Sequence, residues 1–517
     1  MSEETAPAFG AEATTGSSVV RGGLWKMLSN ALPQVYALVI SVAAARYLGP
    51  DGMGRQSFIA FVEISVIELL TSGFAMSLQR YVGESVGAER GAQARWLARA
   101  TFRILLGAAV LGGGLLVVLG LLGSEPRAAW ILAGVAAFSG VLASVPGAIL
   151  TGLQRWRDAT LAGLVTGGAG TVATVLVLVL GGRISAMFAV EAGMLLLVLV
   201  WTGILARRSL SAVSTELEPA PRLRRRSLRF AAYSSASGVL YLIVWRRSEF
   251  FFLNHYSEDS QIAFYSIAFA LVTAVVRLPS AMGSVLAPAV ATLLGAGEHD
   301  RIRRGFSRAL RLLLIVTMPV AAATAALGPL AVRLVWGEDF AAAREPLLIM
   351  VGASLITPVT VLASSLLAGL EYVRLPLVAT MAAAVVDLGL AAALVPHHGA
   401  VGAAIANAAA QLAAGIPLIL YSARRAGPIR WGWGGLLRCA TVSAAGGAAA
   451  WGVAAGLGGV GGLVLGLVAG AAVFFALARV IGLVEREDAA WAADLLGSRA
   501  GELPRRVVLA LAVRKRG

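Results

Sequence analysis

Apolar runs long enough to cross a lipid bilayer fill this sequence from residue 24 to residue 482. A membrane helix needs about 20 apolar residues to span roughly 30 Å of hydrocarbon. Runs of this length occur near residues 24–45, 57–79, 103–122, 128–150, 160–181, 184–205, 231–254, 262–286, 309–328, 346–368, 376–395, 400–421, 436–457 and 461–482. The chain is 58% hydrophobic and only 14% charged, which excludes a soluble globular protein. The sequence therefore predicts an all-α polytopic membrane protein with fourteen transmembrane helices.

Basic residues are concentrated on alternate loops between these runs. The chain has 43 Lys and Arg against 28 Asp and Glu, and in a membrane protein such an excess marks the cytoplasmic loops. Placing the N-terminus inside collects most of the basic residues on the inner side, including the arginines of 206–228. We therefore expect a multi-pass protein of the inner (cytoplasmic) membrane with both termini cytoplasmic, and no nucleic-acid partner.

The two halves of the chain share a weak internal repeat. At an offset of 209 residues, Tyr47 falls on Tyr256 and Arg99 on Arg308, and at an offset of 217 the stretch 150–157 falls on 367–374. Each repeat contains six spans, so both enter the membrane from the same side, related by a pseudo-two-fold axis along the membrane normal. The predicted organisation is a disordered cytoplasmic tail (1–20), an N-lobe (21–206), a basic cytoplasmic linker (207–228), a C-lobe (229–422), two further helices (423–482) and a cytoplasmic C-terminal tail (483–517).

Ionisable side chains inside the predicted spans are the candidates for function. Placing each of them at the centre of a membrane helix costs about 3 kcal/mol, so such residues usually have a function. The basic candidates, suited to bidentate phosphate contact in a central cavity, are Arg46, Arg246, Arg247 and Arg277. The acidic candidates, for carrying coupling ions or for pairing with the arginines, are Glu63, Glu68, Glu191, Glu249 and Asp387.

Simpler roles stay open for several of these residues. Arg246 and Glu249 are spaced i and i+3, so local neutralisation explains that pair as well as substrate binding does. Arg46 lies at the end of its span and can reach the membrane interface by snorkelling. Glu68 and Arg277 are separated by the repeat offset and are expected near the midplane, where they either meet across the two lobes or pair within their own lobes. The Arg-rich linker either binds anionic lipid headgroups or only anchors the topology.

Five stretches resemble one family of membrane proteins. Residues Ala45–Gly54, with Leu-Gly-Pro-Asp-Gly-Met-Gly at their end, are similar to a signature of polysaccharide-biosynthesis membrane proteins. Arg247-Ser-Glu249 followed by Ala263–Ala268, then Leu286–Thr292 and Pro396–Ala406, also resemble this family. Two departures are Glu249, where the family usually has Asp, and Ala263-Phe264 in place of a glycine before Tyr265. The resemblance indicates the oligosaccharide flippases of the multidrug/oligosaccharidyl-lipid/polysaccharide exporter superfamily.

The resemblance implies that the protein moves a polyprenyl-pyrophosphate-linked oligosaccharide across the membrane by alternating access of two lobes. It implies lipid-linked oligosaccharide, membrane lipids and polysaccharide assembly proteins as partners, a proton or sodium as coupling ion, and no cofactor. The alternative is a proton- or sodium-coupled multidrug exporter of the same fold. A polymerising membrane glycosyltransferase is disfavoured by the short outer loops. The sequence has no Walker motif, nucleophile elbow or metal triad, so a transporter is expected rather than an enzyme.

Overall fold

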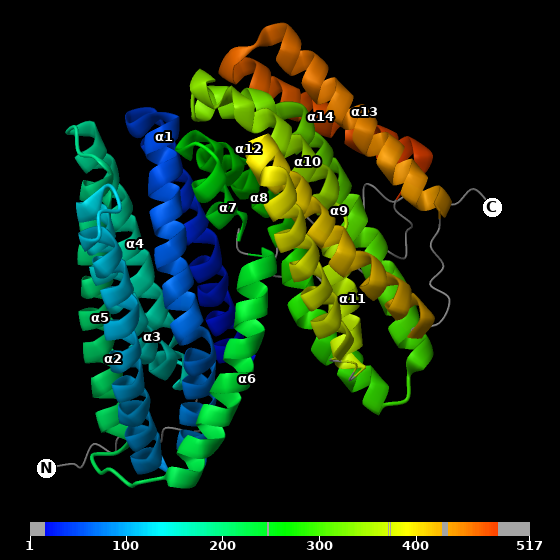
Figure 1. The fold of residues 1–517 in the computed structure, drawn as a ribbon. Helices are drawn as coiled ribbons and strands as arrows, with labels where there is room; N and C mark the ends of the chain where they lie inside the picture. The colour runs from blue at the N-terminus through cyan, green and yellow to red at the C-terminus, as the bar shows by residue number, and fades with distance from the viewer. Residues whose placement is uncertain (1–15, 246–247, 371, 373, 426–432, 484–517) are drawn as a thin grey trace, which may run out of the picture. The chain divides into compact units, whose positions relative to one another are not determined.

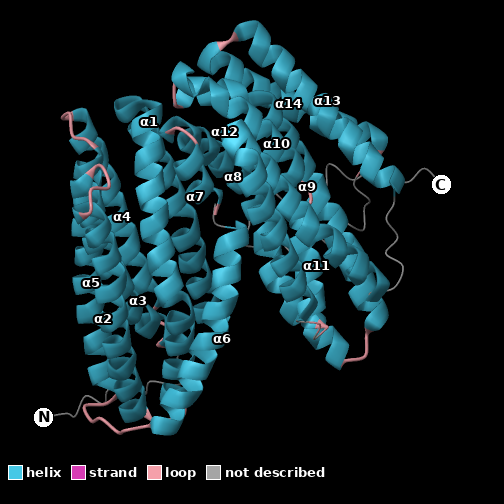
Figure 2. Ribbon diagram, viewed as in Figure 1, coloured by secondary structure: helices cyan, strands magenta, loops and turns pink. Residues whose placement is uncertain are grey.

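The computed structural model describes residues 16–245, 248–370, 372, 374–425 and 433–483, which form helices and loops without strands (Figure 2). The helices (Figure 1) are α1 (Gly16–Gly87), α2 (Gly91–Leu121), α3 (Arg127–Gly152), α4 (Trp156–Val179), α5 (Ile184–Val213), α6 (Pro221–Trp245), α7 (Glu249–Tyr256), α8 (Asp259–Gly295), α9 (His299–Val335), the 3₁₀ helix η2 (Glu338–Ala343), α10 (Arg344–Ser354), α11 (Thr357–Gly369), α12 (Arg374–Arg425), α13 (Trp433–Leu457) and α14 (Gly459–Ile481).

Two of these helices each contain two predicted spans. Helix α1 is kinked at Gly49 (φ 70°, ψ −179°) and α12 at Gly399 (φ 49°, ψ −128°). Such dihedral angles are accessible essentially only to glycine, because a Cβ would clash with the backbone. Among the described residues, eleven stretches are long and apolar enough to cross a membrane. Two of these eleven stretches, in α1 and α12, each contain two spans, which gives thirteen. Helices α6 and α7 together cover one more span. The total is fourteen, so the fourteen-helix prediction is confirmed.

The helix boundaries follow the internal repeat predicted from the sequence. Helix α3 begins at Arg127 and ends at Gly152, and the pair α10–α11 begins at Arg344 and ends at Gly369, a shift of 217 residues at both ends. The turn at Gly49 corresponds, at the offset of 209, to the turn between α7 and α8. The two halves therefore share one order of helices, with α13 and α14 added at the end.

The chain divides into two compact units between Arg247 and Ser248. Unit 1 contains α1–α6 and unit 2 contains α7–α14. The sequence predicts that the second lobe begins at residue 229, whereas the structure groups α6 with unit 1. Close backbone approach explains this grouping, because a Cβ on Gly73 of α1 would clash with the carbonyl oxygen of Ala231 in α6. The predicted span 231–254 is thus shared between the two units.

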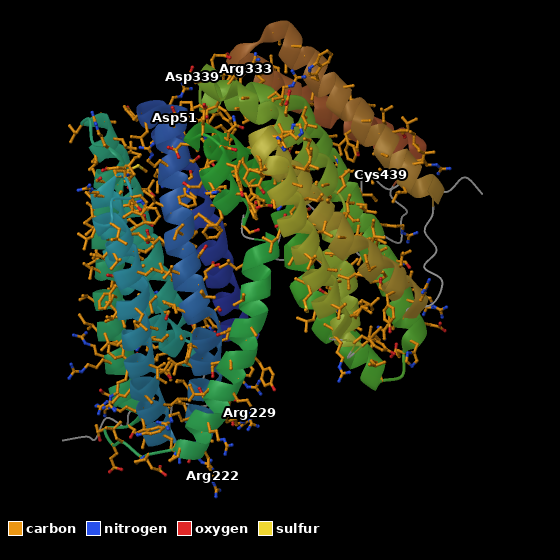
Figure 3. The ribbon with its side chains drawn as sticks, in the orientation of Figure 1. Asp51, Arg222, Arg229, Arg333, Asp339 and Cys439 are labelled. Atoms are coloured by element: carbon orange, nitrogen blue, oxygen red, sulfur yellow. The ribbon has the colours of Figure 1, made fainter. Side chains whose placement is uncertain are left out.

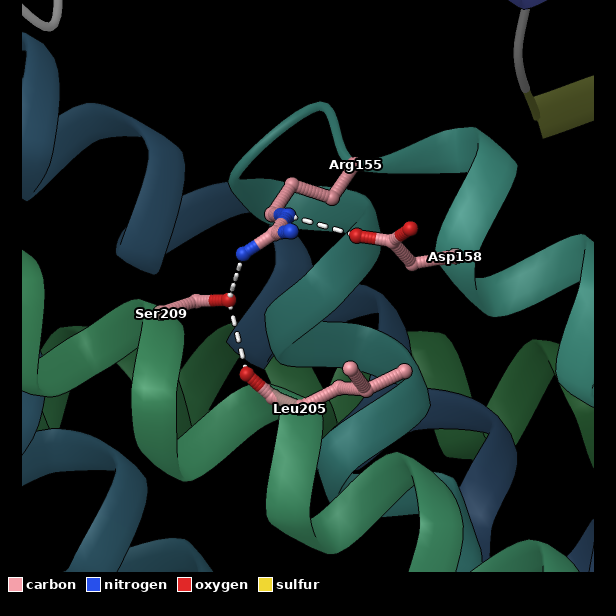
Figure 4. Close-up of polar contacts among 4 residues, drawn as sticks. All are labelled: Arg155, Asp158, Leu205 and Ser209. Carbon is pink, nitrogen blue, oxygen red and sulfur yellow. Dashed lines mark hydrogen bonds and ion pairs between the residues drawn. The ribbon is translucent and has the colours of Figure 1, made fainter.

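Most of the predicted linker is helical. Helix α5 continues to Val213 and α6 begins at Pro221, so only the short segment between them is a loop. Ser209 is buried inside α5, where its hydroxyl donates to the carbonyl of Leu205 (2.7 Å) and accepts from Nη1 of Arg155 (2.6 Å). Arg155 also pairs with Asp158 through Nε (2.6 Å; Figure 4). This cluster ties the turn between α3 and α4 to α5.

Small residues allow α13 and α14 to pack closely against each other and against α9. A Cβ on Gly446 of α13 would lie 3.0 Å from the carbonyl oxygen of Gly470 in α14. Leu327 of α9 packs against Ala450 and Ala454 of α13, and Val442 packs with Phe474 of α14. The two C-terminal helices are therefore an integral part of unit 2.

Candidate functional site

Two buried carboxyl groups of unit 2 form the centre of the candidate site. Glu249 begins α7, and Asp387 lies in the first segment of α12; both side chains are 0% exposed. Ser248, the neighbour of Glu249, donates a hydrogen bond from its hydroxyl to Oδ2 of Asp387 (2.8 Å). The two carboxyl groups are close enough to interact electrostatically. The structure therefore brings together two acids that the sequence analysis selected separately.

A chain of amide and hydroxyl groups extends from Glu249 into α12 and α11. Nδ2 of Asn407 donates to Oε1 of Glu249 (2.8 Å), and Nε2 of Gln411 donates to Oδ1 of Asn407 (2.7 Å). The hydroxyl of Thr357 donates to Oε1 of Gln411 (2.5 Å). Because all of these groups are buried, each bond is made away from water and fixes the orientation of the next side chain. The network holds one oxygen of Glu249 in place.

The kink at Gly399 makes this arrangement possible. Asp387 contacts Ser248, and Asn407 contacts the next residue, Glu249. Asp387 and Asn407 themselves lie twenty residues apart in α12. On a straight helix that separation would be about 30 Å. The fold-back is tight, since a Cβ on Gly402 would lie 2.6 Å from the carbonyl oxygen of Leu394. The side chain of Gln261, from α8, stabilises the kink by accepting the backbone N–H of Ala400 (3.0 Å).

One oxygen on each acid has no hydrogen-bond partner among the described residues: Oε2 of Glu249 and Oδ1 of Asp387. Two neighbouring carboxylates buried without a counter-charge would be strongly destabilising. A proton shared by the pair, or a hard cation such as sodium held by oxygen ligands, would lower this cost by removing one of the two negative charges. The described residues contain no group of three or more His, Cys, Asp or Glu side chains that could hold a metal ion.

Unit 1 contains a second pair of acids. Glu63, in the second segment of α1, is 1% exposed, and neither of its carboxyl oxygens has a hydrogen-bond partner within the described part of the chain. Glu191 of α5 is near enough to interact with it electrostatically. A single proton shared between them would allow this burial. Glu68, one of the predicted acids, is only partly buried and lies outside this pair.

The predicted arginines are not brought together by the described part of the structure. Arg46 is exposed, close to the kink at Gly49. Arg246 and Arg247 lie outside the described residues, as does the side chain of Arg277, although its backbone is part of α8. The pairing of Arg246 with Glu249, and the two alternatives for Glu68 and Arg277, therefore stay predictions.

The sequence analysis missed the uncharged members of the network. It considered only ionisable residues, whereas Ser248, Thr357, Asn407 and Gln411 are neutral. Asn407 and Gln411 lie one helical turn apart in an otherwise apolar span, and amide side chains at membrane depth need hydrogen-bond partners. That spacing was a signal for an inward-facing polar stripe.

With its helices repeated in two halves, the chain has the fold of multidrug/oligosaccharidyl-lipid/polysaccharide exporters. It is similar to an inward-facing multidrug-resistance MATE family transporter (TM-score 0.65, 18% identity, 78% of this chain and 98% of that one). It is also similar to the lipid II flippase MurJ in an inward closed conformation (TM-score 0.67, 13% identity, 89% and 98%). A transporter of this superfamily from Pyrococcus furiosus is a third similar structure (TM-score 0.56, 18% identity, 80% and 96%).

Sequence comparison gives the family. The profile described as polysaccharide biosynthesis protein matches residues 19–294, more than half of the chain. This protein belongs to the polysaccharide biosynthesis protein family, as the motifs in its sequence indicate. The MatE profile matches residues 240–392, a range that includes both Glu249 and Asp387. A search of curated proteins finds no match.

Proposed function

We propose that this protein is a flippase that moves polyprenyl-pyrophosphate-linked oligosaccharide, a precursor of a cell-surface polysaccharide, across the inner membrane by alternating access. The observation that carries the proposal is the family match over residues 19–294. The lipid II flippase among the similar structures is in keeping with a lipid-linked cargo. We expect proteins of polysaccharide assembly to supply the cargo on one side and to receive it on the other.

In this proposal the substrate binds through arginines in a central cavity. The pyrophosphate needs a water-filled, positively charged path, while the lipid tail stays in the bilayer. Arg247 and Arg277 are the central candidates, joined by Arg46 and Arg246, because a guanidinium group makes two parallel hydrogen bonds to a phosphate. These assignments come from the sequence and from the chemistry of the cargo.

The ion that drives transport binds, in our proposal, at Glu249 and Asp387. The supporting observation is the pair of buried carboxyl oxygens without hydrogen-bond partners among the described residues. A proton or sodium ion bound there reduces the charge of the pair from −2 to −1, and its release restores the repulsion between the two carboxylates. Binding energy that differs between two conformations is what shifts a conformational equilibrium. The Glu63–Glu191 pair is a candidate for a second, proton-binding site in unit 1.

A proton- or sodium-coupled multidrug exporter is the second candidate function. The MatE match over 240–392 favours it, because that range contains the proposed ion site. An exporter of cationic drugs would recognise its substrates through acidic and aromatic groups. The two functions therefore differ in the charge of the substrate.

A flipping assay with purified protein in liposomes separates the two functions. We expect the wild type to move a fluorescent polyprenyl-pyrophosphate oligosaccharide, and Arg247→Ala to reduce this rate to background at unchanged protein abundance. Arg247→Lys should restore only part of the rate, since a point charge does not reproduce the guanidinium fork. The matched control is Arg333→Ala, which removes an exposed arginine at the end of α9 (Figure 3). Transport of a cationic dye, but not of the glycolipid, would support the exporter instead.

The predicted orientation can be tested with single cysteines in a Cys439→Ser background. Asp51 and Arg222 lie at opposite ends of unit 1 (Figure 3), and we place the Arg222 end in the cytoplasm. Glu216, in the loop before α6, and Glu258, in the turn after α7, are both exposed. An impermeant thiol reagent added to intact cells is expected to label Glu258→Cys and to label Glu216→Cys only after permeabilisation. Labelling of both in intact cells would contradict the predicted orientation.

A further inference from the structure

A cavity of about 600 Å³ lies at one end of unit 1, where α1, the start of α2 and the start of α6 meet. Its walls include Glu84, Ser85, Ala88, Arg90, Arg222 and Arg226. Figure 3 shows Arg222 and Arg229 along this end of α6. By the distribution of basic residues this is the cytoplasmic end. Neither the proposed transport function nor its ion sites use this cavity.

Hydrogen bonds within unit 1 fix the walls of the cavity. The N–H of Arg90 donates to the carbonyl of Ser85 (2.8 Å), which sets the turn between α1 and α2. Nη1 of Arg95 donates to the carbonyls of Ser214 (3.0 Å) and Thr215 (2.5 Å), and this holds the loop before α6 against α2. The side chain of Gln93 donates to Glu218 in the same loop (3.0 Å).

Helix α6 is fixed to α1 beside the cavity. The buried hydroxyl of Ser77 donates to the carbonyl of Ser227 (2.8 Å). Arg226 lies over the ring of Tyr81, with 5.1 Å between the guanidinium carbon and the ring centroid. The cavity is open to solvent on one side, and its walls belong to elements that are joined by these contacts.

The charges that line the cavity leave two arginines unmatched. Arg226 pairs with Glu84 (2.7 Å), the one acid in the lining. Arg90 and Arg222 are exposed side chains at the rim of the cavity, and they make no ion pair with any described residue. The cavity wall includes the first three residues of α6, Pro221, Arg222 and Leu223. The positive end of the α6 helix dipole therefore adds to the charge of the two arginines.

We propose that this cavity binds the phosphate group of an anionic lipid headgroup. Two guanidinium groups beside a helix N-terminus match the charge and the hydrogen-bonding capacity of a phosphate. The cavity volume lies within the range of about 300–1,000 Å³ usual for small-ligand sites. Its position at the end of membrane-spanning helices places it at headgroup level, where basic pockets bind anionic lipids.

The test uses the full-length protein in detergent and native mass spectrometry. Short-chain phosphatidylglycerol is titrated against phosphatidylcholine of the same chain length and against inorganic phosphate. We expect phosphatidylglycerol to bind at least about tenfold more tightly than phosphatidylcholine, and the double variant Arg90→Gln/Arg222→Gln to lose this preference. The control is Arg224→Gln/Arg225→Gln, which removes the same charge from exposed residues of α6 outside the lining. Its affinity should stay within about threefold of the wild type, a difference of roughly 0.7 kcal/mol.

A second variant, Ala88→Trp, fills the cavity without changing any charge. We expect it to weaken phosphatidylglycerol binding about tenfold while the melting temperature stays near that of the wild type, because Ala88 is exposed in the turn after α1. Equal losses in the two arginine double variants would overturn the proposal in favour of diffuse surface attraction. Unchanged binding by Ala88→Trp would also overturn it. If inorganic phosphate binds as tightly as the lipid, the phosphate site stands and the lipid is overturned as its source.

Discussion

Replacement of Glu249 with glutamine is expected to reduce transport about 100-fold while the protein still reaches the membrane in normal amount. Removing one partner of a buried charge interaction costs about 3 kcal/mol, which corresponds to a factor of more than 100 in cation affinity. The fold should tolerate the change, because glutamine keeps an oxygen that can accept the hydrogen bond from Asn407. The substitution also removes a buried carboxylate, one oxygen of which has no hydrogen-bond partner among the described residues, and this favours the folded state.

The same variant separates ion binding from substrate binding. If sodium is the coupling ion, adding it at 100 times its dissociation constant should stabilise the wild type by about 2.7 kcal/mol, and this stabilisation should disappear in Glu249→Gln. If the ion is a proton, transport should follow an imposed pH gradient in the wild type and not in the variant. Glu258→Gln, an exposed acid in the turn after α7, is the control and should behave as the wild type. Full transport by Glu249→Gln would remove this acid from the coupling site.

A substitution at Gly399 is expected to have the second large effect. Alanine there would place a Cβ 2.6 Å from Oε1 of Gln261, in a backbone conformation that residues with side chains rarely adopt. The backbone strain costs about 1–3 kcal/mol, and loss of the hydrogen bond between Gln261 and Ala400 adds about 1 kcal/mol. The kink would open, and Asp387 and Asn407 would no longer reach α7 together. We expect lower thermal stability and loss of transport.

Gly389→Ala is the matched control on the same helix. A Cβ at Gly389 meets no atom within 4 Å, and its backbone is helical, so alanine should be neutral or stabilise by up to about 1 kcal/mol. Thermal unfolding in detergent compares the two variants directly. Equal unfolding temperatures for Gly399→Ala and Gly389→Ala would show that the kink does not depend on glycine.

Hydropathy predicted the helices well because membrane spans carry a strong signal. The bilayer requires long apolar helices with all backbone hydrogen bonds internal, so both length and position can be read from the sequence. The repeat offsets also anticipated the matching ends of α3 and of α10–α11. The limits of the linker were harder to predict, because polar helix ends outside the bilayer have no hydropathy signal. The sequence analysis thus placed the start of the linker at residue 207, whereas helix α5 continues to Val213 and Ser209 is buried.

The candidate site could be predicted only in part. Glu249 and Asp387 were selected because an ionisable side chain inside a membrane span is costly. That argument identifies single residues but does not show which residues they contact. Asn407 joins them only because α12 folds back at Gly399, and a single glycine among many in this sequence gives little indication of such a turn. The division after Arg247 depends on how tightly α6 packs on α1 at Gly73, which is a property of side-chain size and not of hydropathy.

The equal helix boundaries of the two halves bear on how this chain arose. Matching helix ends at a constant offset are what duplication of an ancestral gene produces. The buried acids differ between the halves, because the position equivalent to Glu63 is Val272 and the position equivalent to Glu249 is Ile40. The two halves therefore share their helix order but not their buried acids, so ion binding in one half does not predict ion binding in the other.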